Sequence, residues 1–388
     1  MGPSFYEFFA GGGMARAGLG PGWRCLFAND FDPRKAAAYR ANWGGAEMRV
    51  GDIHDLTAGD LPAAGPAGAA CDLAWASFPC QDLSLAGGGA GLGGTRSGAF
   101  WGFWSLMAGL RDDGRPPRLL VLENVGGALT ARGGADFEAL CGALERLGYA
   151  FGALTLDAVH FLPQSRPRVF FVAAREEAAA GLHGPGPQAW TVSDGLRRAQ
   201  ARLPGSLARH WRWWRLPEPG PRSRSLADIL QDSPNDAAWH APEQTSRLLD
   251  LMTPAHRAKV AAAQAAGRRV VGTLYRRTRP DGSGARAQRA EVRFDGVAGC
   301  LRTASGGSSR QTILLVEGER IRSRLLSARE AARLMGLPDS YQLPAGYTDA
   351  YHLAGDGLAV PVVAHLREHL LEPLLGLGRP MQPAIAAE

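Results

Sequence analysis

Short apolar runs that end at polar or glycine-rich residues recur through the first half of the chain. Five of them are SFYEFFA, RCLFAND, CDLAWAS, RLLVLEN and RVFFVAA, all within residues 4–174. Runs of this length and character are typical of buried parallel strands. A stretch with helical spacing, DFEALCGALERLGY, lies between the last two. The alternation predicts a doubly wound α/β sheet over residues 4–175, with functional residues at the C-terminal ends of the strands.

From about residue 180 to 300 this periodicity gives way to Pro, Gly, Arg and Trp. The segments WRWWR at 211–215 and YRRTRPDGSGARAQR at 275–289 lie here, and the composition predicts a second, less regular domain. We expect the tryptophans of WRWWR to pack in a core, with base stacking as the alternative. Helical spacing returns in SAREAARLMGL and in VPVVAHLREHLLEPLL.

The composition describes a folded protein with a basic surplus. The chain has 388 residues, and 45% of them are hydrophobic. This length and apolar fraction suffice for a large core and two domains. The net charge is +6. A sequence pI near 9.3 favours a polyanionic partner such as nucleic acid. Only Lys35 and Lys259 are lysines, however, and a GC-rich coding sequence is an alternative explanation for the arginine preference.

Five cysteines without CxxC spacing argue against a disulfide framework and against a zinc site. The N-terminus does not resemble a signal peptide, and no run of 18 apolar residues occurs. These features predict a cytoplasmic protein that uses no metal and does not associate with membranes.

The first predicted strand ends in EFFAGGGMARAG, residues 7–18, where a glycine-rich turn precedes a helix. Such a turn lets the backbone approach a nucleotide-like cofactor closely, although a tight turn without a ligand is the alternative. Asp30 ends the next strand, where a carboxylate accepts hydrogen bonds from ribose hydroxyls. Phe31 is placed to lie against a purine, and Asp52 to accept a hydrogen bond from the adenine amino group.

Cys80 in FPCQDLS follows the strand CDLAWAS and precedes the glycine-rich LAGGGAGLGGTRSGAF. A free cysteine is often only a small buried apolar side chain. One at the end of a strand, before a segment suited to close over a site, is placed to act as a nucleophile. A thiol with a pKa of about 8.5 is only partly ionised at neutral pH, so nearby arginines would have to assist it.

Acidic and basic side chains converge on the same predicted edge of the sheet. Glu123 ends the next strand in LENVGGAL, where a buried carboxyl can be protonated and act as an acid. Arg166 and Arg168 in PQSRPRVFF are two positions apart and lie on one side of an extended segment. Taken singly, Glu123 as a surface cap and the arginines as solvated charges are the alternatives.

In this order the motifs resemble those of the bacterial-type DNA (cytosine-5)-methyltransferases, over residues 4 to about 370. EFFAGGG matches the cofactor motif, NDFD and GDI the next two, FPCQ the nucleophile motif, ENV the acidic motif and QSRPR the QxRxR motif. RLLSAREAARLMGLPDSY resembles the helix that follows the recognition region. GDGLAV resembles the closing motif, with Asp356 where the family has Asn.

The resemblance implies a Rossmann-like sheet of the SAM-dependent methyltransferases with a smaller, irregular target-recognition domain. The implied bounds are 1–184 for the catalytic domain, 185–310 for the recognition domain and 311–388 for a C-terminal segment that returns to the catalytic domain. The implied reaction is methylation of C5 of a cytosine flipped out of duplex DNA. Cys80 adds to C6, and S-adenosylmethionine donates the methyl group. Glu123 and Arg168 hold the base, and Arg166 supports the site.

The same resemblance assigns two further groups of residues. The cofactor group is Phe9, Ala10, Gly11, Gly12, Gly13, Asp30, Phe31, Asp52, Ile53, Pro79 and Asp356. The DNA-contacting group is Gln81, Ser84, Arg276, Arg277, Arg302, Thr303, Gly306 and Gly307. The last four lie in CLRTASGGSSR, which resembles the family's recognition loop, with a glycine hairpin turn as the alternative.

We expect a monomer that acts on double-stranded DNA, with a cognate restriction endonuclease as a further partner in the cell. An RNA cytosine-5 methyltransferase is one alternative, but that branch of the family usually lacks so large a recognition region. A catalytically idle DNA-binding protein is another, but it has no need of Cys80, Glu123 and Arg168 together.

Overall fold

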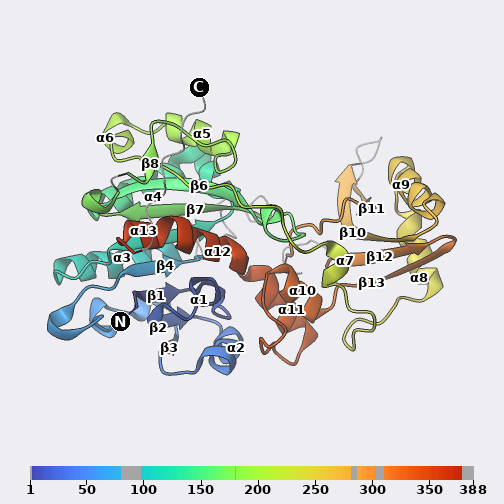
Figure 1. Ribbon diagram of the computed structural model, residues 1–388, viewed down its shortest axis with the longest axis horizontal. Coiled ribbons are helices and arrows are strands. Elements are labelled where there is room, and N and C mark those ends of the chain that lie inside the picture. Colours follow the sequence, from blue (N-terminus) through green and yellow to red (C-terminus); the bar gives the residue numbers. More distant parts are fainter. Residues whose placement is uncertain (1, 80–97, 180, 281–285, 303–309, 378–388) are drawn as a thin grey trace. The chain divides into compact units, whose positions relative to one another are not determined.

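The computed structural model describes residues 2–79, 98–179, 181–280, 286–302 and 310–377, which form two compact units (Figure 1). The first unit comprises Met1–Asp157, Pro167–Pro219 and Val360–Glu388, and the second Ala158–Arg166 and Gly220–Ala359. These bounds differ from the predicted domains, since residues 185–219 belong to the first unit and 311–359 to the second. The functional boundaries remain predictions. None of the helices described is long and apolar enough to cross a bilayer.

The first unit is built on a seven-stranded mixed sheet with the order β3-β2-β1-β4-β5-β7-β6. The strands are β1 (Ser4–Phe8), β2 (Arg24–Asp30), β3 (Met48–Val50), β4 (Leu73–Ala76), β5 (Leu119–Asn124), β6 (Ala150–Asp157) and β7 (Pro167–Ala174). Strands β1 to β5 are parallel to their neighbours among themselves, so their C-terminal ends share one edge. The strand order reverses between β1 and β4, the kind of position where open α/β sheets bind ligands. The predicted α/β class is therefore confirmed.

Strand β7 is antiparallel to both of its neighbours, which corrects the parallel orientation predicted for RVFFVAA. The physical reason is the short connection from β6, residues 158–166, because a parallel crossover needs a dozen or more residues. As a result, the N-terminal end of β7 lies at the edge where β5 ends, and Val169 pairs with Asn124.

Helices cover both faces of this sheet (Figure 1). On one face α3 (Ala99–Asp112) and α4 (Ala135–Arg146) pack in a core that includes Phe8, Phe103 and Phe137. On the other, α2 (Pro33–Trp43) meets β2, and α1 (Met14–Leu19) packs against α12 (Val360–Leu366). Smaller elements are β8 (His183–Gly184), α5 (Asp194–Ala201), α6 (Gly205–Ala208), β9 (Trp213–Trp214) and α13 (Glu372–Leu374). Trp211 and Trp214 are buried, which confirms packing as their role.

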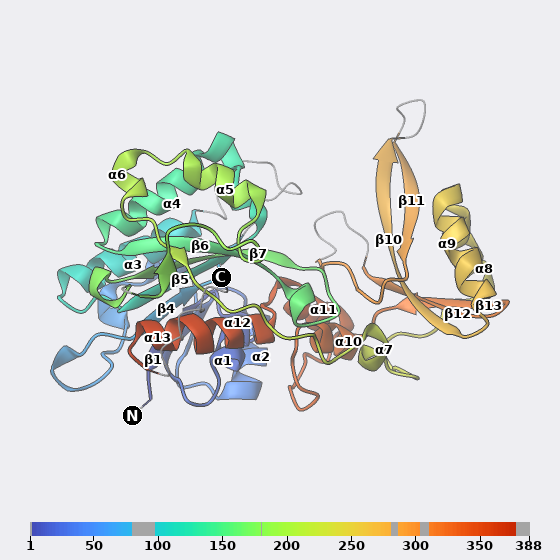
Figure 2. The ribbon, with the colours of Figure 1, turned by 45° about the horizontal axis from the view of Figure 1, so that its top comes forward.

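The second unit contains a regular antiparallel sheet with the order β11-β10-β12-β13 (Figure 2). Its strands are β10 (Arg269–Pro280), β11 (Arg286–Arg293), β12 (Thr312–Glu317) and β13 (Arg320–Leu325). Leu274 and Leu314 of this sheet share a core with Val260 of α9 (Pro254–Ala265), beside α8 (Pro242–Asp250). The sheet corrects the expectation of an irregular domain, which arose because arginines occupy so many of the exposed strand positions. The other helices are α7 (Leu226–Ile229), α10 (Ala328–Leu334) and α11 (Tyr347–Asp356).

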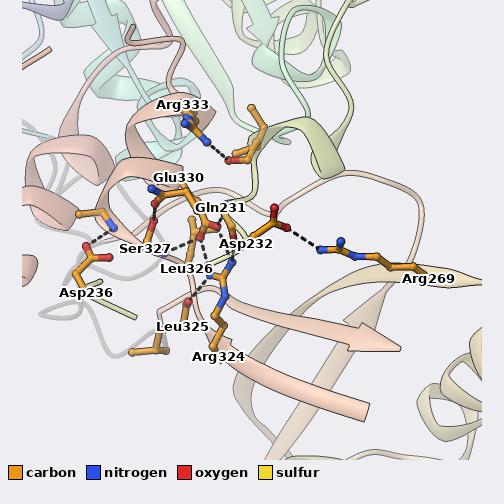
Figure 3. Close-up of polar contacts among 12 residues, drawn as sticks. Gln231, Asp232, Asp236, Arg269, Arg324, Leu325, Leu326, Ser327, Glu330 and Arg333 are labelled. Atoms are coloured by element: carbon orange, nitrogen blue, oxygen red, sulfur yellow. Dashed lines mark hydrogen bonds and ion pairs between the residues drawn. The ribbon is translucent and has the colours of Figure 1, made fainter. Parts of the chain in front are cut away.

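A buried ion pair joins β13 to α10 in this unit (Figure 3). Arg324 donates to both carboxylate oxygens of Glu330, at 2.7 and 2.6 Å, and to the carbonyl of Gln231 at 3.0 Å. Glu330 also accepts from the backbone N–H groups of Gln231 and Ser327. These charge-assisted bonds satisfy most of the polar atoms of a pair that water does not reach. Arg324 and Glu330, both within RLLSAREAARLMGLPDSY, therefore have a structural role, because their ion pair attaches α10 to β13.

Candidate active site

The turn after β1 holds several residues in the left-handed backbone region. Phe9, Gly11 and Gly13 have φ angles of 57°, 56° and 76°, and a non-glycine residue such as Phe9 adopts this region at an energetic cost that proteins concentrate at functional sites. Gly13 is also required by packing, because a Cβ would lie 2.3 Å from Nε1 of Trp43. A Cβ at Gly11 would meet open space, so the turn leaves room beside its backbone. Ala10 and Gly12 complete the turn, and Gly12 accepts a hydrogen bond from Trp43.

Asp30, at the C-terminal end of β2, fixes this turn. One carboxylate oxygen accepts from the N–H of Gly11 at 2.8 Å, and the other from the N–H of Asp32 at 2.8 Å. The side chain is mostly buried, and burial raises the pKa of Asp30. A carboxylate offers about four acceptor positions, so these two bonds leave capacity for ligand hydroxyls.

Next to Asp30, the ring of Phe31 is 73% exposed. An apolar ring in water beside a glycine turn is suited to lie against a flat heterocycle. Asp52 is exposed after β3 and accepts from the N–H of His54 at 3.0 Å, which starts the short helix Ile53–Asp55. Ile53 is buried beneath it. The structure thus places Asp30, Phe31 and Asp52 at the same edge of the sheet.

The strand before the nucleophile motif is tied to the strand beside it. The ring of Phe78 packs against Phe100, with centroids 5.5 Å apart. The carbonyl of Phe78 accepts a hydrogen bond from the buried side-chain amide of Asn124 at 3.2 Å. These contacts fix where the chain leaves β4, and Pro79, which follows, is exposed.

Glu123 and Arg168 form an ion pair at this edge, with 3.1 Å between Oε1 and Nε. Both side chains are largely shielded from water, at 11% and 15% exposure. The antiparallel orientation of β7 makes the pair possible, because it brings the start of β7 to the end of β5. A carboxylate beside a guanidinium presents acceptors and donors together, which suits the polar edge of a base.

Arg166 has different surroundings, within the second unit. It is 3% exposed, and its guanidinium donates to the carbonyls of Gly355 at 3.0 Å, Gly357 at 2.7 Å and Leu301 at 3.2 Å. These bonds join the GDG turn to the first residues of CLRTASGGSSR. They indicate a residue that positions backbone, and the supporting role in the site predicted for Arg166 stays a prediction.

Asp356 is the last residue of α11 and is exposed between Gly355 and Gly357. Of the predicted DNA-contacting residues, Arg276, Arg277 and Arg302 are exposed in the second unit. Six predicted residues lie outside the described part of the chain: Cys80, Gln81, Ser84, Thr303, Gly306 and Gly307.

Two residues of this region were missed by the sequence reading, although both lie in the motifs it used. Asn124 is the Asn of ENV, and its amide holds Phe78. Glu7 begins EFFAGGG, is 2% exposed, and accepts from the N–H of Arg16 at 3.4 Å. Burial raises the pKa of Glu7 to about 8. A sequence motif shows neither the burial of a side chain nor its contact with a distant part of the fold. For this reason the sequence assigned no role to Asn124 or Glu7.

The described cysteines differ in burial. Burial raises the pKa of Cys25 and of Cys71 to about 12, and also raises that of Cys141. Thiols of this kind are inert, because the thiolate is the nucleophile. Cys300 is partly exposed.

Comparisons with known proteins cover nearly the whole chain. A family model described as "C-5 cytosine-specific DNA methylase" matches residues 4–372. The chain is 25% identical over 368 residues to the Type II methyltransferase M.NlaX of Neisseria lactamica, covering 94% of this chain and 95% of that protein. It is 25% identical over 381 residues to the Type II methyltransferase M.HaeII of Haemophilus aegyptius, covering 98% and 96%. The fold is similar to that of the S. pombe Dnmt2 methyltransferase, with a TM-score of 0.56, 19% identity and coverage of 96% of this chain and 98% of that one.

Proposed function

Because the chain belongs to the C-5 cytosine-specific DNA methylase family, we propose that it methylates C5 of a cytosine in duplex DNA with Cys80 as the nucleophile and S-adenosylmethionine as the methyl donor. The observation that carries this proposal is the Glu123–Arg168 pair, which lies at the edge of the sheet where Asn124 ties down the start of FPCQ. A pair of side chains suited to bind a base therefore lies next to the end of β4, the strand that precedes Cys80 in the sequence.

The chemistry requires such a group, because C5 of cytosine is a poor nucleophile. The Cys80 thiolate forms a bond to C6, which makes the electrons of the C5–C6 double bond available at C5. Glu123 in its protonated form donates its proton to N3 as the C6 bond forms, and its other oxygen accepts from the exocyclic amine, while Arg168 donates to O2. C5 gains the methyl group from S-adenosylmethionine, which is left as S-adenosylhomocysteine. Loss of the C5 proton to a base then restores the double bond and expels Cys80 as a thiolate.

The other cysteines support this assignment by contrast. Cys25, Cys71 and Cys141 are buried thiols with raised pKa values, so they are unsuited to attack a base. Cys300 lies beside Arg166 in the second unit, with 3.4 Å between Sγ and Nη1. Cys80 is the cysteine that follows β4 in a motif of the family's nucleophile type.

The turn after β1 fits S-adenosylmethionine. Gly11 opens onto free space, Asp30 keeps acceptor capacity for ribose hydroxyls, and the exposed ring of Phe31 suits adenine. Asp52 and Ile53 would hold the adenine, and Phe9, Ala10, Gly12, Gly13, Pro79 and Asp356 complete the proposed cofactor group. When bound, this cofactor supplies an activated methyl group.

A cytosine inside a stacked duplex is inaccessible, so the target must be flipped out at a cost of a few kcal/mol. We assign DNA recognition to the second unit, with Arg276, Arg277 and Arg302 among the contacting residues. Relatives named Type II methyltransferases support a role in restriction and modification, with a cognate endonuclease as cellular partner. That the protein acts as a monomer stays a prediction.

The test is methyl transfer from radiolabelled S-adenosylmethionine to duplex DNA or to tRNA, followed by nucleoside analysis. We expect label in 5-methyldeoxycytidine from duplex DNA. Label in tRNA alone would assign the chain to the RNA-acting alternative. Binding of DNA without transfer to either substrate would favour an idle DNA-binding protein.

A further inference from the structure

The ribbon formed by β10 and β11 carries arginines on two faces that differ in their surroundings. Register fixes the faces, because Arg277 pairs with Arg289, and Arg276 with Ala290. On one face Arg277, Arg279 and Arg289 lie with Glu291, and we call it the Glu291 face. The other face bears Arg276, Thr278, Arg286 and Gln288, and we call it the Arg276 face. Figure 2 shows the ribbon beside α8 and α9.

The two faces differ in what the strand residues nearer the core of the unit contact. Below the Arg276 face, Leu274 and Val292 are buried in the core that includes Val260 of α9. Below the Glu291 face, Thr273 donates to the carbonyl of Val297 at 3.0 Å, and Tyr275 to the carbonyl of Cys300 at 2.9 Å. The Glu291 face therefore continues into the segment that carries Arg302.

The carboxylate of Glu291 contacts the guanidinium groups of Arg279 and Arg277, each on its Nε side. Nε and Nη2 of Arg279 donate to its two oxygens at 2.7 and 3.3 Å, and Nε of Arg277 lies 3.4 Å from Oε2. Hydrogen bonds from Arg279 lower the pKa of Glu291, so this carboxylate is charged at neutral pH. The guanidinium of Arg277 also lies over the ring of Tyr275, 5.8 Å from its centre.

This geometry has a chemical consequence. A carboxylate that bonds to the Nε side of a guanidinium does not occupy its Nη1–Nη2 edge. The N–H donors along that edge are spaced to match a pair of acceptors. Guanine offers such a pair, O6 and N7, in the major groove, which is wide enough for a two-stranded ribbon. Fixing the side chain in advance also reduces the entropy lost on binding.

Repulsion on the same face indicates a polyanionic partner. Arg277 and Arg289 are directly opposed across the strands, and like charges in that position destabilise a sheet. Glu291 offsets only part of this charge. The side chains of Arg277 and Arg279 remain 48% and 49% exposed, so they are accessible to DNA.

We propose that the Glu291 face reads guanine edges in the major groove, with Arg279 and Arg277 as specificity-determining residues and Glu291 as their positioning residue, whereas Arg276 and Arg286 contact phosphates. This assignment rests on the proposed function and deepens it, since it names the bases and the face that recognise the target.

The test uses the full-length protein and a library of duplexes with randomised sequence, methylated in vitro and read by bisulfite sequencing. Arg279→Ala is expected to relax the preference for guanine at one position by roughly 5- to 150-fold. Glu291→Gln is expected to relax the same preference, although it removes a negative charge and so leaves non-specific DNA binding as strong as before or stronger. Arg276→Ala is the matched control. It should weaken binding to all sequences alike and reduce the slope of log affinity against log salt by about one unit.

The outcomes separate this assignment from the proposed function. A wild-type protein that methylates no cytosine contradicts the proposed function, and the assignment with it. Sequence-specific methylation that Arg279→Ala and Glu291→Gln leave unchanged overturns the assignment alone. The same holds if Arg276→Ala relaxes the guanine preference. Thermal unfolding of each variant establishes that the fold is retained.

Discussion

Among single residues, Glu7 has an unusual environment for a carboxyl group. It lies in the interior of β1, and Oε2 has no hydrogen-bond partner among the described residues. The charged or titratable groups that face it are Arg16 from α1, Cys25 and Asp30 from β2, and Tyr39 from α2. Burial outweighs the favourable contacts with Arg16 and raises the pKa of Glu7 from 4.5 to about 8.

This shift predicts a pH dependence of stability. Between pH 4.5 and about 8 the folded state binds the proton that the unfolded state has released, so the free energy of unfolding falls as the pH rises. Glu7→Gln removes this effect. Relative to wild type, the variant should gain about 1 to 4 kcal/mol between pH 5 and pH 8 in denaturant-induced unfolding.

The exposed Glu138 on α4 offers a control. The difference between Glu138→Gln and wild type should be nearly independent of pH over this range. If Glu7→Gln also gives a pH-independent difference, Glu7 is already ionised in the folded protein, and its burial does not control its titration.

How well single residues were predicted depends on where their partners lie in the chain. Asp30 and Glu123 were placed correctly at the edge of the sheet, because the end of an apolar run marks the end of a strand. The amide of Asn124 bonds a carbonyl 46 positions earlier, and no local pattern contains that contact. For the same reason Glu7 appeared only as the first letter of a motif.

Among the elements, the contact between α1 and α12 joins the beginning of the chain to its later part. A Cβ at Gly18 would lie 2.4 Å from Cβ of Val363 and 2.9 Å from the carbonyl oxygen of Val360. The helices can approach this closely only because position 18 has no side chain. We expect Gly18→Ala to lower the free energy of unfolding by about 1–3 kcal/mol through overpacking.

A matched control is Gly22→Ala, where a Cβ would meet nothing within 4 Å. Urea unfolding of the two variants measures the difference, and Gly22→Ala should lie close to wild type. Equal effects at the two positions would show that the approach of α12 to α1 does not depend on Gly18.

The elements also show where the sequence reading failed. RVFFVAA was recognised as a strand, but its direction depends on the short connection from β6, and β6 itself was not identified. In the second unit, β10 does not alternate buried and exposed residues, because residues 272–274 are buried in succession and its later half, Arg276–Pro280, is exposed on both faces. Arginines on a solvated ribbon do not produce the apolar alternation by which strands are predicted.

For the whole molecule, the basic surplus alone is a poor guide to function. Many arginines are structural: Arg324 is buried against Glu330, and Arg115 donates to the carbonyls of Leu61 and Ala58. The ordered set of motifs was more informative. It predicted the family, which the match over residues 4–372 confirms. Motif order survives changes in packing and composition, whereas net charge does not reveal which charges are already paired.

The proposed mechanism depends on a covalent bond between Cys80 and the target cytosine, and a mechanism-based trap detects that bond. In duplex DNA with 5-fluorocytosine at the methylated position, C5 carries fluorine in place of the proton that must leave, so Cys80 cannot be expelled. With S-adenosylmethionine present, the wild-type protein should form a complex with this DNA that survives denaturing electrophoresis. Cys300→Ser should form the same complex, and Cys80→Ser should form none. A Cys80→Ser protein that is trapped, or that methylates DNA at a rate near that of the wild type, would contradict the account.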